Sequence, residues 1–181
     1  MSAENLISLL TDYLQTYPQE SATVDRYIEF VNNHSDCFER SQLAGHVTGS
    51  AWLVNQAGTH VLLTHHRKLN RWLQLGGHAD GHTNALEVAI KEATEESGIE
   101  NIHALSTALF DVDIHEIPER KNEPAHFHYD ARFALQVTDS DSFTVSDESH
   151  ALAWVPINDL ASHTDEVSML RMADKWQQFK Y

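Results

Sequence analysis

The chain has 181 residues, of which 41% are hydrophobic, and its formal net charge is −15 at pH 7. This length suits one well-buried α/β core with a small appendage and leaves too few residues for two full domains. The negative charge excludes passive binding to nucleic acid or to an anionic membrane, because either polyanion would repel the chain. Phosphate chemistry in such a chain would require a metal ion.

The sequence carries no sign of secretion or membrane insertion. Its single cysteine, Cys37, cannot form a disulfide within the chain, and the N-terminal residues lack the basic start and cleavage site of a signal peptide. No apolar run approaches the roughly 18 residues that span a bilayer. We therefore expect a cytoplasmic protein.

Residues 1–42 are predicted to form a helical extension. Apolar residues recur at helical spacing over residues 4–16, and the same spacing returns over residues 22–33 after Pro18. We expect two helices that pack on the main domain, which then occupies residues 43–181.

Three strands are expected next. Residues 46–54 and 60–66 alternate as a β-hairpin around a short turn, and a third strand at residues 72–75 leads directly into Gly76 and Gly77.

An amphipathic helix is predicted over residues 84–97. Gly98 is its stop signal, and its buried stripe is expected to be Leu86, Ala89, Ile90 and Ala93.

The C-terminal half is expected to add three strands and a closing helix. The strands are predicted at residues 105–114, 126–138 and 151–155. The closing helix is predicted at residues 165–179, and its inward side chains are expected to be Val167, Leu170, Met172 or Ala173, and Trp176.

The run from Gly76 to Ile99 is the part of the chain most typical of a reactive site. Glu92, Glu95 and Glu96 are spaced i, i+3 and i+4, so they share one helix face on which like charges repel. An acidic ridge beside a glycine-rich turn favours a divalent cation, and oxygen ligands suit Mg²⁺ or Mn²⁺.

This run resembles the box of the Nudix hydrolases, G-x5-E-x7-R-E-U-x-E-E-x-G-U, where U is a bulky aliphatic residue. The matches at the spacing of that box are Gly77, Glu92, Glu95, Glu96, Gly98 and Ile99. The resemblance implies an α/β fold, namely a Nudix-like α/β/α sandwich with a mixed central sheet, to which the N-terminal helical extension is added.

The resemblance also implies roles for the matched residues. Glu92, Glu95 and Glu96 would bind Mg²⁺ or Mn²⁺, with the backbone carbonyl of Gly76 as a further ligand. Glu95 and Glu96 would also take part in catalysis. A solvated acidic helix face is the alternative.

Two box positions depart from the pattern. Thr83 stands where the box has its first glutamate, and Lys91 stands where it has arginine. In the family these two residues usually support the loop and the helix, so their joint replacement predicts a re-paired loop. Asp80 and Glu87 are candidate partners of Lys91, and Glu87 is placed four residues before it for a helical ion pair.

Many family members use another acidic residue shortly before a strand that ends in Trp and Pro. Here Asp147 and Glu148 precede Trp154. Glu148 is the preferred catalytic base, and Asp147 stays open as the other candidate. An ordinary charged loop before an edge strand is the alternative interpretation.

The chain also resembles, more weakly, isopentenyl-diphosphate isomerase. The matching positions are His46, His78 and the pair His126 and His128, whose imidazoles would hold a second metal, a transition metal such as Zn²⁺ or Mn²⁺. Hydrogen-bonded structural histidines are the alternative. The isomerase has a reactive cysteine where this chain has Gly76, so a hydrolase is favoured.

A basic cluster precedes the glycine turn. Arg67, Lys68 and Arg71 would bind the outer phosphates of a substrate, and Trp72 would stack on a base. The alternative is a hairpin exit with Trp72 in the core.

The predicted reaction is metal-dependent hydrolysis of a diphosphate linkage in a small molecule, a nucleoside diphosphate linked to another group. The alternatives are an isomerase-like enzyme and a Nudix-fold ligand-binding module without turnover. The residues do not determine the oligomeric state, and the resemblance is compatible with a homodimer.

Overall fold

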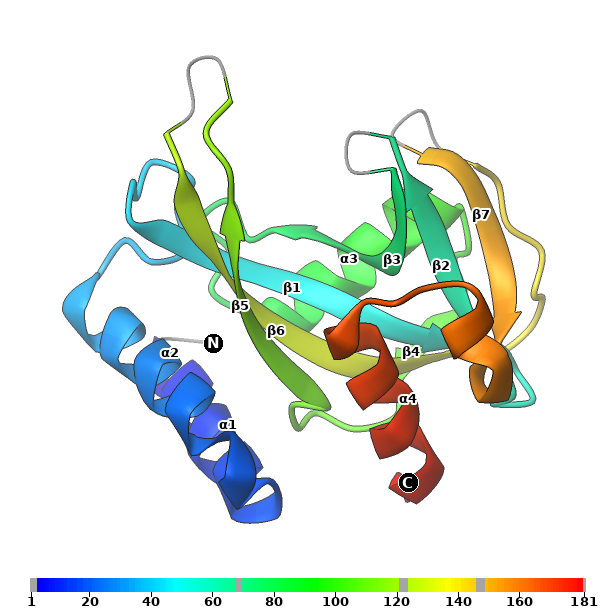
Figure 1. Ribbon diagram of the computed structural model, residues 1–181, viewed down its shortest axis with the longest axis horizontal. Coiled ribbons are helices and arrows are strands. Elements are labelled where there is room, and N and C mark those ends of the chain that lie inside the picture. The colour runs from blue at the N-terminus through cyan, green and yellow to red at the C-terminus, as the bar shows by residue number, and fades with distance from the viewer. Residues whose placement is uncertain (1–2, 68–69, 121–123, 146–148, 181) are drawn as a thin grey trace.

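The computed structural model describes residues 3–67, 70–120, 124–145 and 149–180. Within these residues the chain forms a seven-stranded sheet in the order β4-β6-β1-β3-β2-β7, with β5 also paired to β6 (Figure 1). The strands are β1 (Gly45–Val54), β2 (His60–His66), β3 (Arg71–His78), β4 (Ile102–Ala104), β5 (Asp111–Ile117), β6 (His126–Val137) and β7 (Ser149–Pro156). The sheet is mixed, because β1 runs parallel to β6 whereas its pairing with β3 is antiparallel.

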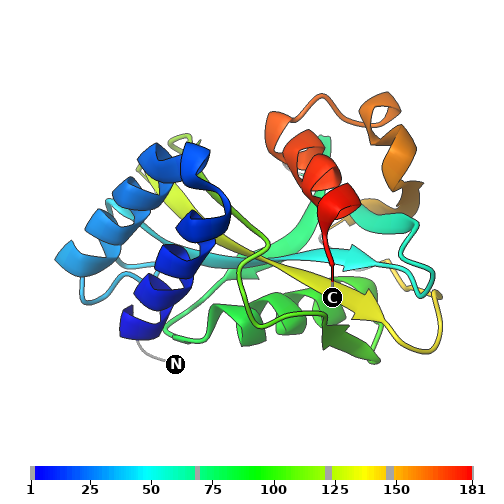
Figure 2. The same ribbon diagram turned by 90° about the horizontal axis from the view of Figure 1, so that it is seen from below.

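Helices cover both faces of this sheet. The α-helices are α1 (Ala3–Thr16), α2 (Ser21–Asn33), α3 (Ala85–Ser97) and α4 (Val167–Gln178), and short 3-10 helices cover Pro18–Glu20 and Ile157–Ser162. Figure 2 shows α3 and α4 on opposite sides of the sheet, which confirms the α/β/α sandwich with a mixed central sheet. No helix in the described part of the chain is both long and apolar enough to cross a bilayer.

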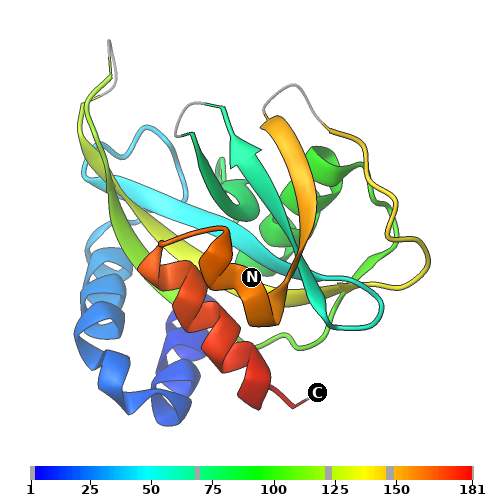
Figure 3. The ribbon, with the colours of Figure 1, turned by 45° about the vertical axis from the view of Figure 1, so that its right-hand side comes forward.

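The two helices of the N-terminal extension form where the periodicity predicts them. They pack beside β5 and β6, as Figure 3 also shows. The ring of Phe30 stacks on that of Tyr129 with centroids 3.8 Å apart, and the Tyr27 hydroxyl donates a hydrogen bond of 2.7 Å to the Tyr129 carbonyl. The extension therefore packs on the main domain as expected, while the boundary at residue 42 stays a prediction.

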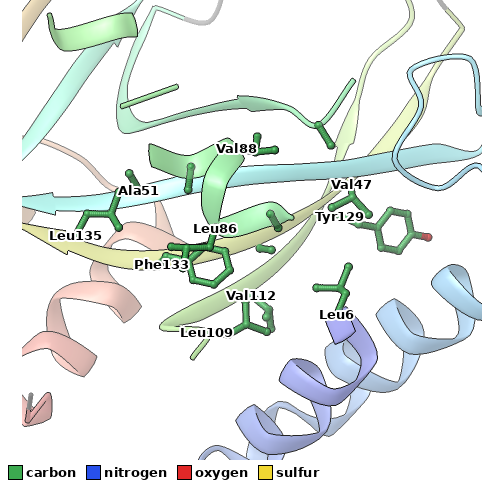
Figure 4. Close-up of a cluster of buried hydrophobic side chains, with 14 of the residues drawn as sticks. Leu6, Val47, Ala51, Leu86, Val88, Leu109, Val112, Tyr129, Phe133 and Leu135 are labelled. Carbon is green, nitrogen blue, oxygen red and sulfur yellow. The ribbon is translucent and has the colours of Figure 1, made fainter. Parts of the chain in front are cut away.

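Two hydrophobic clusters hold the layers together. The larger one joins α1, α2 and α3 to the sheet, and Figure 4 shows Leu6, Leu86 and Phe133 among its members. The smaller one lies beneath α4 and includes Trp52 and Met172. Each fully buried side chain of this size contributes about 1.5–3 kcal/mol by leaving water.

The predicted hairpin is only partly correct. β1 and β2 meet at their turn, where Val54 lies opposite Val61, but β3 is inserted between them along the rest of their length. β3 also continues through the glycines to His78, because Gly76 and Gly77 pair with Ser50 and Gly49 of β1. Alternation along a strand identifies its two faces, not its neighbours.

The predicted strand at residues 105–114 is only partly correct. Residues 111–114 belong to β5, whereas residues 105–110 follow the end of β4 and form no strand. Both β4 and β5 pair antiparallel with β6. The amide of Leu105 donates to the Ala134 carbonyl, and that of Phe110 donates to the Arg132 carbonyl. Only one residue of β6 separates those two carbonyls, so the four residues between Leu105 and Phe110 must leave the sheet.

The inward stripe of the closing helix agrees with the prediction except at its first residue, and Leu170 and Trp176 pack against the smaller cluster. Met169, Met172 and Ala173 are buried in α4, whereas Val167 is 76% exposed, so its predicted burial is wrong. Val167 is the first residue of the helix and lies outside the i, i+3, i+4 row that starts at Met169.

A buried carboxylate, Asp111, joins α4 to the sheet. It is fully buried and accepts hydrogen bonds from Arg171 at 2.9 Å, Lys175 at 2.6 Å and Arg132 at 3.1 Å. Lys175 also contacts Glu20 at 2.7 Å, which extends the network to the N-terminal extension. Burial raises the pKa of Asp111, but these cations outweigh that effect and hold it below its usual value.

We predict that Asp111→Asn lowers the free energy of unfolding by about 3 kcal/mol or more at pH 7, because it leaves buried cations without their anion. Urea unfolding measures this loss. The difference in unfolding free energy between wild type and variant should shrink as the pH falls below about 4. In that range Asp111 takes up a proton in the unfolded chain but stays ionised in the folded one, so the wild type loses stability.

The matched control is Asp25→Asn, at an exposed position of α2, which should change stability by less than about 0.5 kcal/mol. Equal stabilities of Asp111→Asn and wild type at pH 7 would contradict the role of the network.

Candidate functional site

Two of the predicted glutamates lie against the glycine pair at the end of β3. Oε1 of Glu96 accepts a hydrogen bond of 3.0 Å from the amide of Gly76. A Cβ atom at Gly77 would stand 2.6 Å from Cδ of Glu92, far inside van der Waals contact. The absence of side chains at these positions therefore lets both carboxylates reach the strand backbone.

The helix that carries the glutamates has well-defined ends. Asn84 is its N-cap and accepts a hydrogen bond from the amide of Glu87, and Gly98 ends it in the left-handed conformation at φ 68°. Of the predicted buried stripe, Leu86, Ala89 and Ala93 are buried, whereas Ile90 is half-buried and packs against the core.

Lys91 binds the acidic ridge itself. Its Nζ lies 3.2 Å from Glu92 and 3.1 Å from Glu95, and the hydrogen bonds that it donates to Glu95 and to Glu92 raise the Lys91 pKa. The predicted partners are wrong, since Glu87 contacts Asn84 and His82, and Asp80 pairs with Arg40.

Three histidines from three strands meet beside the glycine pair. His46 of β1, His78 of β3 and His128 of β6 each offer one ring nitrogen, and these nitrogens all lie within 4.8 Å of one another. Among the described residues this is the one such group of three or more His, Cys, Asp or Glu side chains, so Glu92, Glu95 and Glu96 do not form one. The strand register explains the convergence, because His46 lies directly opposite His128 and His78 lies opposite Thr48.

The environment of this cluster favours neutral imidazoles. Burial, followed by the neighbouring positive charges, lowers the pKa of His78 to about 4 and that of His128 to about 2. The Nε2 atoms of His46 and His128 are buried and have no hydrogen-bond partner among the described residues. Neutral imidazoles with unused nitrogens are the form that binds a metal ion.

Two further histidines stand next to the cluster. The ring of His126 lies 4.9 Å from that of His46, and its Nδ1 donates to the Pro124 carbonyl, but it is not part of the three-nitrogen group. The ring of His115 lies 5.4 Å from that of His128 and bonds Asp113. His115 was missed in the sequence, because the strand predicted at residues 105–114 ends one residue before it.

Asp130, two residues after His128, is held by its own neighbours. Its carboxylate accepts from the hydroxyls of Thr48 at 2.8 Å and Ser50 at 2.7 Å, and from Arg132 at 2.7 Å. These residues form a hydrogen-bonded polar cluster on the sheet beside the histidines.

The basic cluster before the glycines is partly engaged by the fold. Arg71 pairs with Glu166 at the start of α4, and the ring of Trp72 stacks on that of His65 at 5.1 Å while it packs against the cluster under α4. Arg67 is exposed at the end of β2. Lys68 and both candidates for the base, Asp147 and Glu148, lie outside the described residues.

Comparison with known proteins agrees with this geometry. A model of the NUDIX domain matches residues 45–175. No curated protein sequence matches the chain.

Three solved structures illustrate the likeness of the fold. A hydrolase of the NUDIX family from Clostridium perfringens is 24% identical, and the match covers 75% of this chain and 98% of the other at a TM-score of 0.56. The Ap4A hydrolase of C. elegans is 17% identical, with 74% and 96% covered and a TM-score of 0.54. The dihydroneopterin triphosphate pyrophosphohydrolase of E. coli is 17% identical, with 74% and 93% covered and a TM-score of 0.56.

We predict that Lys91→Gln tightens the binding of Mn²⁺ about fivefold, because it removes a positive charge from the carboxylates of Glu92 and Glu95, worth about 1 kcal/mol. Isothermal titration calorimetry measures the Kd. Lys180→Gln removes the same charge near the C-terminus and should leave the Kd unchanged. Unchanged or weaker binding in Lys91→Gln would show that the ammonium does not compete with a metal ion.

Proposed function

Since the chain belongs to the Nudix family and is a Nudix-type pyrophosphohydrolase, we propose that it cleaves the diphosphate linkage of a nucleoside diphosphate joined to another group, with Mg²⁺ or Mn²⁺ as cofactor. The observation that carries this proposal is the contact of Glu92 and Glu96 with the backbone of Gly76 and Gly77. This contact places the acidic residues of α3 next to the end of β3, so that they form one continuous surface.

The donors present fit a hard divalent cation. Glu92, Glu95, Glu96 and the Gly76 carbonyl offer oxygen donors, which Mg²⁺ and Mn²⁺ prefer. When bound, such an ion neutralises phosphate charge and lowers the pKa of a bound water. The neighbours named for Ap4A and for dihydroneopterin triphosphate support a substrate with a phosphoanhydride bond.

The structure also bears on the isomerase alternative. Cys37, the single cysteine, is fully buried in the hydrophobic cluster shared with the extension, and burial raises its pKa to about 11. A thiol in that setting is a structural residue rather than a reactive group, and Gly76 offers no acid. These features support hydrolysis.

We predict that Glu96→Gln and Glu95→Gln each lower kcat at least about 100-fold with little loss of stability, because each removes a charge and almost no volume. The assay is release of phosphate or nucleoside monophosphate from nucleotide sugars, dinucleotides and nucleoside triphosphates with Mg²⁺ or Mn²⁺. Glu148→Gln tests the proposed base in the same assay.

Glu100→Gln, at an exposed position just beyond α3, is the matched control and should retain wild-type kcat. Wild-type activity in both ridge variants would refute the assignment of the site. Metal binding without turnover of any compound in the panel would instead favour the ligand-binding module.

We further propose that His46, His78 and His128 hold a transition metal such as Zn²⁺, with His126 as a further ligand. The support is the approach of one nitrogen of each ring to within 4.8 Å of the others, together with buried ring nitrogens of His46 and His128 that have no partner among the described residues. Imidazole suits Zn²⁺ and related ions better than Mg²⁺, so this site and the acidic ridge would select different metals.

We predict that the purified protein contains a transition metal in near-stoichiometric amount, and that His46→Ala and His78→Ala lose it. Elemental analysis by mass spectrometry measures the content. His103→Ala, an exposed histidine of β4, should retain the metal. Equal metal content in all three variants would mean that the cluster is structural.

A further inference from the structure

The loop between β3 and α3 connects the two candidate metal sites. Residues 79–84 leave β3 directly after His78 and end at Asn84, the N-cap of the helix that carries the glutamates. The path of this loop therefore determines where the acidic ridge stands relative to the histidine cluster.

The loop is bonded to the segment that follows α2. The amide of Gly81 donates a hydrogen bond of 2.9 Å to the Phe38 carbonyl, and the neighbouring Cys37 carbonyl accepts one of 2.7 Å from Val47. The Val47 carbonyl in turn accepts from the amide of Ala79 at 3.3 Å. Backbone hydrogen bonds thus link the loop to residues 37–38 and to the start of β1.

Arg40 completes this attachment with a two-pronged ion pair. Its Nε and Nη2 both donate to the carboxylate of Asp80, the second at 2.7 Å. The hydrogen bond from Arg40 is also the main cause that lowers the Asp80 pKa. A bidentate guanidinium–carboxylate pair fixes orientation as well as distance.

The backbone at this point requires such support. Asp80 and Gly81 both adopt left-handed conformations, at φ 48° and 81°. The left-handed conformation costs a residue with a side chain about 1 kcal/mol or more, and Asp is one of the few residues that adopt it. The bonds from Arg40 stabilise Asp80 in this conformation. Beside it, a Cβ atom at Gly81 would stand 2.6 Å from the carboxylate of Glu39.

The box residues that would support the loop from within are replaced. Thr83 carries no charge, and Lys91 is engaged by Glu92 and Glu95. Arg40 supplies a charged contact that reaches the loop from outside the box.

We propose that Arg40 is a positioning residue for the candidate active site. By holding Asp80, it keeps the loop in the path that places α3 and its glutamates against the glycines of β3. This inference rests on the proposed hydrolase function.

The energetics make this role separable from folding. The side chains of Arg40 and Asp80 are 58% and 52% exposed, and exposed ion pairs contribute about 0–1 kcal/mol to stability. A displacement of about 1 Å in a reacting group can cost about 100-fold in rate. Loss of Arg40 should therefore reduce catalysis far more than stability.

The test compares Arg40→Ala, Arg40→Lys and the exchange Arg40→Asp with Asp80→Arg in the full chain. We expect Arg40→Ala to lower kcat about tenfold or more with a smaller change in KM, and hydrogen exchange at the Gly81 amide to become faster. Arg40→Lys keeps the positive charge but cannot form the bidentate pair, so its kcat should lie between those of wild type and Arg40→Ala. The exchanged pair should recover part of the kcat that Arg40→Ala loses.

Arg26→Ala is the matched control. Arg26 also ties the extension to the sheet, but its guanidinium lies over the rings of Phe127 at 4.3 Å and Tyr129 at 6.0 Å, both on β6. It should leave kcat and the exchange at Gly81 unchanged.

The outcomes separate this inference from the proposed function. An active wild type whose kcat and Gly81 exchange are unchanged in Arg40→Ala would overturn the role of Arg40. Equal losses in Arg26→Ala and Arg40→Ala would overturn it too, because any loosening of the extension would then suffice. A wild type that is inactive on the whole panel would refute the hydrolase, whereas the exchange measurement would still test the loop.

Discussion

The close packing of α3 against glycines of β1 and β3 is the constraint on which the rest of the structure depends. A Cβ atom at Gly49 would stand 2.6 Å from the Ala85 carbonyl oxygen, and one at Gly77 would stand 2.6 Å from Cδ of Glu92. A methyl group at either place would push the helix outward. Because the carboxylates reach the strand backbone only at this short separation, the same glycines that set the packing also create the candidate site.

Buried charge holds the remaining helices in place. Asp111 binds Arg171 and Lys175 of α4, and Lys175 reaches Glu20 between α1 and α2. A buried charge that loses its partner costs about 3–5 kcal/mol. The N-terminal extension is therefore held by the same network as α4. Arg40, which joins the extension to the loop, thus belongs to a segment that is itself anchored to the domain.

Sequence patterns predict features that depend on neighbours along the chain, and they miss those that depend on neighbours in space. Helix α3 was predictable because its periodicity, its stop at Gly98 and the spacing of its glutamates are all local. The break between β4 and β5 was not predictable, because it depends on how these two strands share the pairing positions of β6, which is distant in the sequence. The pair of Arg40 and Asp80 joins residues 40 positions apart, and no local pattern predicts it.

The histidine cluster shows why composition alone does not define a site. Residues two apart in a strand are about 7 Å from each other, so Gly76, beside the carboxylates, and His78, in the cluster, bring oxygen and nitrogen donors close together. These donors prefer different ions. A buried polar group without a partner costs about 1–3 kcal/mol. Within the described part of the chain, Nε2 of His46 and of His128 has no partner and carries that cost, which the proposed transition metal would remove.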